Sequence, residues 1–399
     1  MAKRLAIPSK EVALRIVGPF DSFFAARVQR LNINTDVPTT TIDELGNSQH
    51  AGVIPDVPAI TLTFSAFDVS HKIFSVLTGT DPTAYPAAGV DISELGEIDA
   101  IVYIKDASVS DYVKTAHAKR LQIRDFTYSY SVTGESTEDY TAVGSEKRWF
   151  KNDVIVDRFT SGTTSFTLTQ TPIQLLNGNN GLSVILDGGY LTEVAGAPAT
   201  GEYRIVGTAL TTGDTRNAQV IAIYHASPAG DNWSDVSDTA YPAAIRGQDV
   251  RVTITAGGQI ERVQSITING NLNPQPVREM GNRAIVGYQK QTATVDGTIT
   301  VLDTDTELLD LLLNGSISSG ATEFELASQC AVSGVDLLIV LYDPCDTSVS
   351  GVIVKSVWIP ELKLTGDSYT SNVNENAQQV LNWSSDTAQC IVYSGAKGA

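Results

Sequence analysis

The side chains that could carry out chemistry are scattered in this sequence. Four histidines, His50, His71, His117 and His225, lie far apart along the 399 residues. No nucleophile elbow, phosphate-binding loop or metal-ligand spacing accompanies them. We therefore expect histidines that are solvated or that cap helices, with a catalytic dyad as the alternative. The sequence predicts a protein that is not an enzyme and that holds no cofactor or metal.

Two short segments imitate ligand-binding motifs without completing them. The run DTDTE at 303–307 offers the carboxylates of a calcium loop, but it lacks the glycine and the distal glutamate of an EF-hand. A helix N-terminus explains these acids more simply, because Asp and Thr cap helices and acids stabilise their first turn. The run NGNNG at 177–181 lacks the lysine and the following helix of a phosphate loop, so we interpret it as a turn.

Charge and cysteine content bound the surroundings of the protein. The chain has 45 acidic residues against 27 Lys and Arg, a formal charge of −18, and such a surface repels DNA and anionic membranes. Neither a signal-peptide core nor 18 consecutive apolar residues occurs, so we expect a soluble protein that is not exported by that route. Cys330, Cys345 and Cys390 form no CxxC pair. We read them as buried thiols in a reducing cytoplasm, with a disulfide as the alternative.

One segment of the chain occurs twice, and it shows how the chain is organised. Residues 27–52 match residues 262–287 at an offset of 235 with nine identities in 26 positions, where about two are expected by chance. Three further matches follow in the same order: 66–79 with 301–315, 98–106 with 335–343, and 137–140 with 374–377. A period this long predicts tandem domains, which we place at about 11–150 and 247–396.

Apolar residues alternate with polar ones along much of both copies, as in half-buried strands. One short helix interrupts each copy, at about 68–79 and 303–315, where a glycine ends the apolar run. The predicted fold class is mainly β: two homologous β-sandwich or barrel domains, 1–150 and 247–399, each with one flanking α-helix. Between them, residues 151–246 form a small inserted β-domain with a linker at 228–244.

Two long segments rich in Pro, Asn and Thr, 35–58 and 270–293, separate predicted strands. They are longer than ordinary loops, which favours a function or packing on a neighbouring molecule. Both copies keep Glu, Gly and Asn at matching places, and these six are the candidate functional residues: Glu44, Gly46, Asn47, Glu279, Gly281 and Asn282. The alternative is that the glycines only permit a turn with positive φ.

Aromatic residues cluster in one strand region of the first copy. Tyr128, Tyr130, Tyr140 and Trp149 lie in or near FTYSYSVTGESTEDYTAVGSEKRWF. Aromatics on strands usually belong to the core or to cross-strand pairs, and we favour that interpretation over an interface or a carbohydrate-binding platform.

Several of these stretches resemble the tail tube proteins of tailed bacterial and archaeal viruses. They are the segments 36–68 and 131–150 of the first copy, and LTGDSY (364–369) and the segment 277–315 of the second. The resemblance implies a β-sandwich with a flanking helix in each tube domain. It also implies that six such domains close a ring around a continuous lumen, and that a long loop reaches the adjacent ring. With two tube domains per chain, three chains supply the six positions.

The resemblance therefore implies a structural virion protein, the major tail tube subunit, in trimeric rings with pseudo-sixfold symmetry. Its partners would be copies of itself, the tape measure protein, and the tail terminator and tip proteins. DNA would pass transiently during ejection without specific binding, and no membrane is involved. Its place would be the virion tail, assembled in the host cytoplasm, with the middle domain on the tube exterior. The alternatives are the inner tube of a contractile injection system and a β-rich adhesin or glycan-binding protein.

Overall fold

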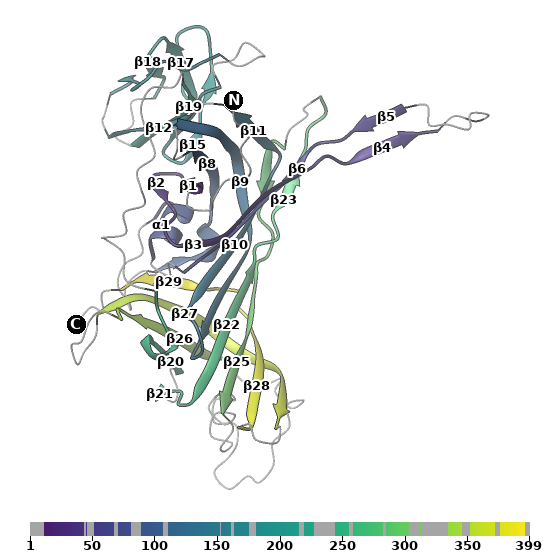
Figure 1. Cartoon of the computed structure of the whole chain (residues 1–399), viewed down its shortest axis with the longest axis vertical. Coiled ribbons are helices and arrows are strands. Elements are labelled where there is room, and N and C mark those ends of the chain that lie inside the picture. The colour runs from purple at the N-terminus through teal and green to yellow at the C-terminus, as the bar shows by residue number, and fades with distance from the viewer. Residues whose placement is uncertain are drawn as a thin grey trace.

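The computed structural model describes residues 12–395 with sixteen gaps, and the account below concerns the described residues alone. The gaps are 44, 46–51, 68–70, 81–88, 107–110, 152, 161–162, 175–180, 215–218, 227–243, 255–257, 282–284, 303–311, 313–333, 345–351 and 372–375. The prediction of a mainly β fold is confirmed: large sheets dominate, and α1 is one short helix among them (Figure 1).

The first lobe, our name for residues 12–150, is a two-layered β structure. Its elements are β1 (Val12–Val17), β2 (Ser22–Phe24), β3 (Val28–Asp36), β6 (Ala59–Ala66), α1 (His71–Thr78), β7 (Val90–Asp91), β8 (Glu97–Asp106), β9 (Asp111–Ser131), β10 (Thr137–Gly144) and β11 (Glu146–Phe150). β6 and β10 alternate between buried and half-buried residues, because one face of each strand packs on the core. The long strand β9 takes part in both layers, pairing with β8 and β11 near its start and with β10 near its end.

The second lobe, residues 244–395, repeats this plan. Its strands are β20 (Val250–Ile254), β21 (Gly258–Gln259), β22 (Val263–Asn271), β25 (Thr294–Leu302), β26 (Val335–Tyr342), β27 (Ile353–Thr370), β28 (Gln378–Ser385) and β29 (Ile391–Ser394). The pairs β1–β8, β8–β9, β9–β10, β10–β6 and β6–β3 correspond to β20–β26, β26–β27, β27–β28, β28–β25 and β25–β22. The two lobes thus share one order of strand pairing, and a common origin by duplication stays a prediction of the sequence repeat.

A backbone irregularity within a long strand also recurs in both lobes. The backbone N–H of Arg120 donates to the side chain of Asp99 at 2.9 Å, and that of Glu361 donates to Asp336 at 3.2 Å. Arg120 and Glu361 have φ of 50° and 51°, a left-handed conformation that is unfavourable for residues other than glycine. The same irregularity in β9 and β27 fixes which residues of the two lobes are equivalent.

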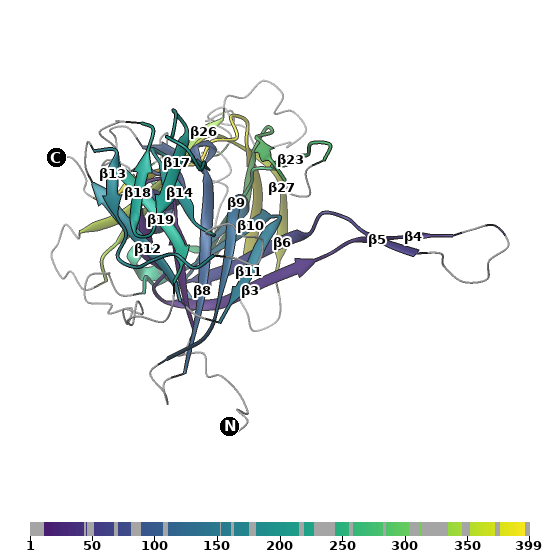
Figure 2. The ribbon, with the colours of Figure 1, turned by 90° about the horizontal axis from the view of Figure 1, so that it is seen from above.

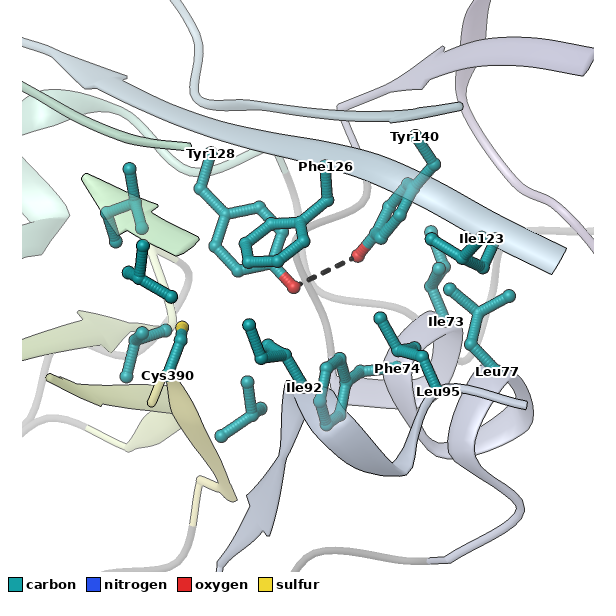
Figure 3. Close-up of a cluster of buried hydrophobic side chains, with 14 of the residues drawn as sticks. Ile73, Phe74, Leu77, Ile92, Leu95, Ile123, Phe126, Tyr128, Tyr140 and Cys390 are labelled. Atoms are coloured by element: carbon teal, nitrogen blue, oxygen red, sulfur yellow. Dashed lines mark hydrogen bonds between the residues drawn. The ribbon is translucent and has the colours of Figure 1, made fainter. Parts of the chain in front are cut away.

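The short helix of the first lobe lies where the sequence placed it. Ile73, Phe74 and Leu77 of α1 are buried in the core below the inner strands (Figure 3). The helix ends at Gly79, which has φ of 75° and donates its N–H to the carbonyl of Ser75. The predicted helix of the second copy lies almost entirely outside the described residues.

The middle domain consists of two four-stranded sheets. One has the order β12 (Val154–Thr160), β19 (Gln219–His225), β14 (Ser183–Leu186) and β15 (Gly189–Tyr190); the other has β13 (Ser165–Thr167), β18 (Ala209–Thr212), β17 (Glu202–Val206) and β16 (Thr192–Glu193). The first sheet packs on the outer layer of the first lobe: alternate residues of β8, Ile101 and Tyr103, point to this domain, while Ala100 and Val102 point to the lobe core. The middle domain therefore covers the side of the first lobe that faces away from β6 and β10.

The two long segments that we expected to be loops are largely β-hairpins. β4 (Thr39–Ile42) pairs with β5 (Gly52–Pro55), and β23 (Gln275–Val277) pairs with β24 (Gly287–Gln289). The first hairpin projects far from the body as an arm, whereas the second lies close to it (Figures 1 and 2). A hairpin satisfies its own backbone hydrogen bonds, which is why a segment this long does not have to be irregular.

Of the three cysteines, Cys390 is buried and free, as expected for a reducing environment. Cys330 and Cys345 lie outside the described residues. None of the helices in the described ranges combines the length and the apolar character that a membrane span requires.

Candidate assembly interface

The two lobes are joined through their backbones into one sheet. β9 of the first lobe pairs with β22 of the second, from Ser131 opposite Ser265 to Asp125 opposite Asn271. The inner strands therefore follow one another without a break in the order β3, β6, β10, β9, β22, β25, β28 and β27 (Figure 1). The chain thus carries an eight-stranded inner sheet in which each lobe supplies four strands.

One face of the inner sheet is polar over its whole width. Its residues are half-buried or exposed and are mostly Ser, Thr, Asn and Asp: Thr61, Thr63, Ser65, Asp125, Thr127, Ser129, Thr137, Asp139, Thr141, Ser265, Thr267, Asn269, Asp296, Thr298, Thr300, Asn382 and Ser384. The opposite face is apolar and buried, with Leu62, Tyr128, Ile268 and Ile299 among its members. Polar side chains across the lobe boundary bond to one another: Thr127 donates to Asn269, and Asn269 donates to Asp296, both at 3.2 Å.

Few basic residues lie on this polar face. Asp36, Asp125, Asp139 and Asp296 are its acidic residues on the eight strands, and Arg30, Lys363 and Arg124, which pairs with Asp125, are its basic ones. Four acids less three bases leave one net negative charge per chain. A surface of this kind offers phosphate groups hydroxyls and amides, but few cations that would hold them.

Both borders of the inner sheet are open in the described structure. β3 pairs on one side with β6, and β27 from Leu362 onward pairs on one side with β28. Tyr369 near the end of β27 is 59 % exposed, and Asn32, Asn34 and Asp36 of β3 are exposed as well. Open edges of this length offer unpaired backbone groups to a further strand.

A buried polar cluster lies at the lobe boundary, behind the inner sheet. Lys355 of β27 forms an ion pair with Glu138 of β10, and both side chains have no exposed area. The hydroxyl of Tyr140 donates to the other oxygen of Glu138 at 2.6 Å and lies 3.3 Å from the hydroxyl of Tyr128 (Figure 3). The Lys355 ammonium also lies 4.3 Å from the centre of the Tyr128 ring, a cation–π contact.

Burial governs the protonation of this cluster. Loss of solvation, followed by the negative charge of Glu138, raises the pKa of Tyr128, Tyr130 and Tyr140 well above the ordinary value of a tyrosine. Burial likewise raises the pKa of the Cys390 thiol at the edge of the cluster. These groups keep their protons near neutral pH, so the cluster is a structural joint with one ion pair and no free nucleophile.

The comparisons with known proteins give only distant matches. No protein-family model matches this sequence, and no curated protein matches it. One similar solved structure is a chain of the sheath–tube complex of PVC, an extracellular contractile injection system, in its extended state, with 15 % identity and a TM-score of 0.29 over 41 % of this chain and 99 % of that chain. Another is the tube-terminating cap of the anti-feeding prophage, with 13 % identity and a TM-score of 0.24 over 38 % and 95 %. At these scores the functional proposal rests on the geometry of this chain alone.

Of the six candidate residues from the sequence, two are described, and both lie in the segment between β23 and β24. Glu44, Gly46, Asn47 and Asn282 lie outside the described residues. Glu279 is exposed, and Gly281 has φ of 85° with open space where a Cβ would lie. The positive φ of Gly281 agrees with the alternative that this glycine permits a turn, while a role in contacts between rings stays a prediction.

The first arm carries apolar side chains that nothing in the described chain covers. Leu45 lies at its tip, and Ile42, Val53 and Ile54 are each more than 40 % exposed on β4 and β5. The segment that connects β23 to β24 approaches the base of the first arm, since Arg278 donates to Asp56 at 3.4 Å. Exposed apolar residues on a projecting arm are typical of a segment that packs on another molecule.

The expectation for the histidines was wrong at His117. Its Nε2 lies 2.8 Å from Asp99, and both side chains are buried rather than solvated or capping. The same carboxylate accepts from the hydroxyl of Tyr190 in the middle domain at 2.5 Å. Burial would raise the pKa of Asp99, but the hydrogen bond and charge of His117, followed by the bond from Tyr190, hold it below its usual range. The Asp99–His117 pair thus anchors the middle domain to the first lobe through Tyr190. Within the described ranges, no group of His, Cys, Asp and Glu side chains could hold a metal ion.

Sequence reasoning placed three aromatics correctly and missed the ion pair. Tyr128, Tyr130 and Tyr140 are buried core residues, whereas Trp149 on β11 is 49 % exposed. Two signals pointed to the missed pair. Lys355 interrupts the apolar run VIVKSVWI, and Glu138 occupies a core-facing position in the alternation of β10. A charge on the apolar face of a strand predicts a buried partner.

Proposed function

We propose that the protein is the repeating subunit of a hollow tail-like tube, in which β27 of one chain pairs with β3 of the next. The observation that carries the proposal is the pairing of β9 with β22 inside the chain. β27 is the equivalent of β9, and β3 is the equivalent of β22. The internal joint is therefore a template for a joint between chains, with both strands open and in the required direction.

The template fixes the register of the joint between chains. Thr127 lies opposite Asn269 within the chain. The equivalent of Thr127 is Ser368, and the equivalent of Asn269 is Asn34. We therefore expect Ser368 of one chain to lie opposite Asn34 of the next, with both side chains on the polar face.

Three chains joined in this way supply 24 inner strands. For strands about 4.8 Å apart and tilted by about 40°, a closed barrel of that number has a backbone diameter of about 48 Å. Its lining would be the polar face, which carries one net negative charge per chain. A lumen of this width and charge admits a DNA duplex and holds it weakly. The middle domain, on the opposite side of the first lobe, would lie outside the wall.

Engineered disulfides test this joint and count the chains. Asn34→Cys together with Ser368→Cys places thiols on adjacent strands of neighbouring chains, and mild oxidation should link the chains covalently. A ring of three gives linked species that end at three chains on a non-reducing gel. The matched control is Thr127→Cys with Asn269→Cys, which bridges the internal joint and yields a faster-migrating single chain.

Single-cysteine variants at the same positions report any background from the native cysteines. A cross-linked ladder that continues to six chains would refute the trimeric ring and keep the tube. The β27–β3 joint would be refuted if the control disulfide formed efficiently while the Asn34→Cys, Ser368→Cys variant gave no link between chains. This outcome counts only where electron microscopy shows tubes in the sample. A monomeric wild-type protein without rings or tubes would refute the proposed function.

A further inference from the structure

Because the two lobes share one order of strand pairing, each residue of the buried polar cluster at the lobe boundary has an equivalent in the other lobe. Lys355 pairs with Leu341 on β26, and Lys114 occupies the same place opposite Ile104 on β8. Lys114 is thus the first-lobe equivalent of Lys355. Its side chain is exposed.

Glu138 and Tyr128, the first-lobe residues that contact Lys355, also have equivalents in the second lobe. Glu138 pairs with Tyr128, and Gln379 pairs with Tyr369 in the corresponding strands β28 and β27. Tyr128 is fully buried under Lys355, but Tyr369 is 59 % exposed, although the two tyrosines occupy equivalent positions. The difference arises because the second lobe lies beside the first at β9, whereas no described strand pairs with the open edge of β27 at Tyr369.

We infer that the exposed ring of Tyr369, together with Gln379, receives Lys114 of a second copy of this chain. The inference rests on the proposed tube, and it identifies the side chains that join its subunits behind the β27–β3 pairing. In the internal joint the lysine of one lobe lies 4.3 Å from the tyrosine ring of the other. If the first lobe of the next chain sits against the second lobe of this chain in the same way, its Lys114 reaches Tyr369.

Lys114 already lies against one aromatic ring in its own chain. Its ammonium is 4.7 Å from the centre of the Trp149 ring. Trp149 lies on β11, as does Lys147, whose ammonium is 5.7 Å from the centre of the same ring. Docking of a neighbour would place Tyr369 near Lys114, so that two rings contact one cation. Aromatic rings around a partly desolvated ammonium bind it through their electron-rich faces.

The two joints differ in one respect that matters for assembly. Glu138 in the internal joint is replaced by Gln379, which carries no charge. The carboxylate of Asp367 accepts from the Gln379 amide at 3.5 Å, and the Asp367 side chain is exposed. The joint between chains thus rests on aromatic rings and a hydrated carboxylate, and it does not require two opposite charges to leave water together.

A double-mutant cycle tests the contact in the full-length protein. The ring dissociation midpoint in urea is measured for wild type, Lys114→Gln, Tyr369→Ser and the double variant. We expect each single variant to weaken association at each joint by roughly five- to thirtyfold, the range of a partly desolvated cation–π contact, and the double variant to weaken it no further. Tyr369→Phe keeps the ring and should retain the coupling.

Two outcomes would overturn the inference while leaving the tube intact. One is strict additivity of Lys114→Gln and Tyr369→Ser in rings that the Asn34–Ser368 disulfide still traps. The other is a Tyr369→Phe variant as weak as Tyr369→Ser, which would assign the effect to the hydroxyl. Failure of the wild type itself to form rings would overturn the proposed function and this inference together. Circular dichroism of each variant shows that the subunit is folded.

Discussion

Removing one partner of the Lys355–Glu138 pair should destabilise the chain far more than removing both. Both side chains lack any exposed area, and Glu138 has a second partner in Tyr140 at 2.6 Å. Replacing Lys355 by Met takes the cation of this ion pair away from a buried carboxylate, which costs about 3–5 kcal/mol. The double variant Lys355→Met with Glu138→Gln restores most of that loss, because it also removes the desolvation cost of both charges.

The two single variants should respond to pH in opposite directions. In Lys355→Met, Glu138 folds only with a proton, while the unfolded carboxyl is ionised above about pH 4.3. Folding then takes up a proton, so the free energy of unfolding falls by about 1.4 kcal/mol per pH unit as pH rises. In Glu138→Gln, the Lys355 ammonium loses its anion, and folding releases a proton instead. The free energy of unfolding of that variant rises with pH by the same amount.

Urea unfolding followed by circular dichroism at several pH values measures these differences. The labelling rate of the Cys390 thiol gives a local reading, since this buried thiol borders the cluster. A loss of about 3 kcal/mol in the opening free energy corresponds to labelling that is roughly a hundredfold faster, and Cys390→Ser supplies the background. The reasoning is refuted if the double variant is as unstable as Lys355→Met, or if the two single variants share one direction of pH dependence.

Three further predictions concern the middle domain and the arms. Asp99→Asn should lower the free energy of unfolding at pH 7 by about 1.5–3 kcal/mol. Because the pKa of Asp99 is held below 3.8, this difference from wild type should disappear in thermal melts as pH falls through that lowered value. Gly281→Ala should cost about 1 kcal/mol, since φ is 85° there, whereas Gly287→Ala, which also meets open space, should melt like wild type. Replacing residues 39–55 by a two-residue turn should leave a normally melting subunit and rings that no longer stack into long tubes in electron micrographs. Tubes of normal length would show that stacking does not need the arm.

The sequence was most informative where a local pattern repeats and least informative about how the parts meet. Period-two alternation and the 235-residue repeat predicted the strands of both lobes, and a glycine after an apolar run predicted the end of α1. The hairpin pairing of 39–55 was missed, because its turn residues lack the short Asn-Gly signal between two adjoining strands. The Asp99–His117 pair and its bond to Tyr190 were missed as well. Their partners lie 18 and 91 positions apart, and no local pattern connects them.

The packing of the middle domain also changes what its removal would do. Tyr103 donates its hydroxyl to the carbonyl of Val154 at 2.7 Å, and Ile101 is fully buried under this domain. Deletion of residues 160–240 would uncover these apolar residues of β8. Exposed apolar strands favour aggregation, so the deleted protein would need polar replacements on β8 before its assembly could be judged.

The proposed joint between chains and the joint inside the chain differ in chemistry for a physical reason. The joint inside the chain forms once, during folding, when the tether between the lobes already holds their effective concentration high. This joint can therefore accommodate the cost of desolvating Lys355 and Glu138. The buried ion pair that they form fixes the register of β9 on β22. A joint between chains must form from surfaces that remain soluble beforehand. An unpaired buried charge would be costly there, and an exposed tyrosine beside a neutral amide, Tyr369 and Gln379, satisfies both requirements. On this reasoning Gln379→Glu should strengthen the joint between chains by supplying Lys114 with an anion. It should also lower the stability of free subunits, because position 379 is buried and the carboxylate would have no lysine there before assembly. Rings that resist urea no better than wild type would show that Lys114 does not reach this position.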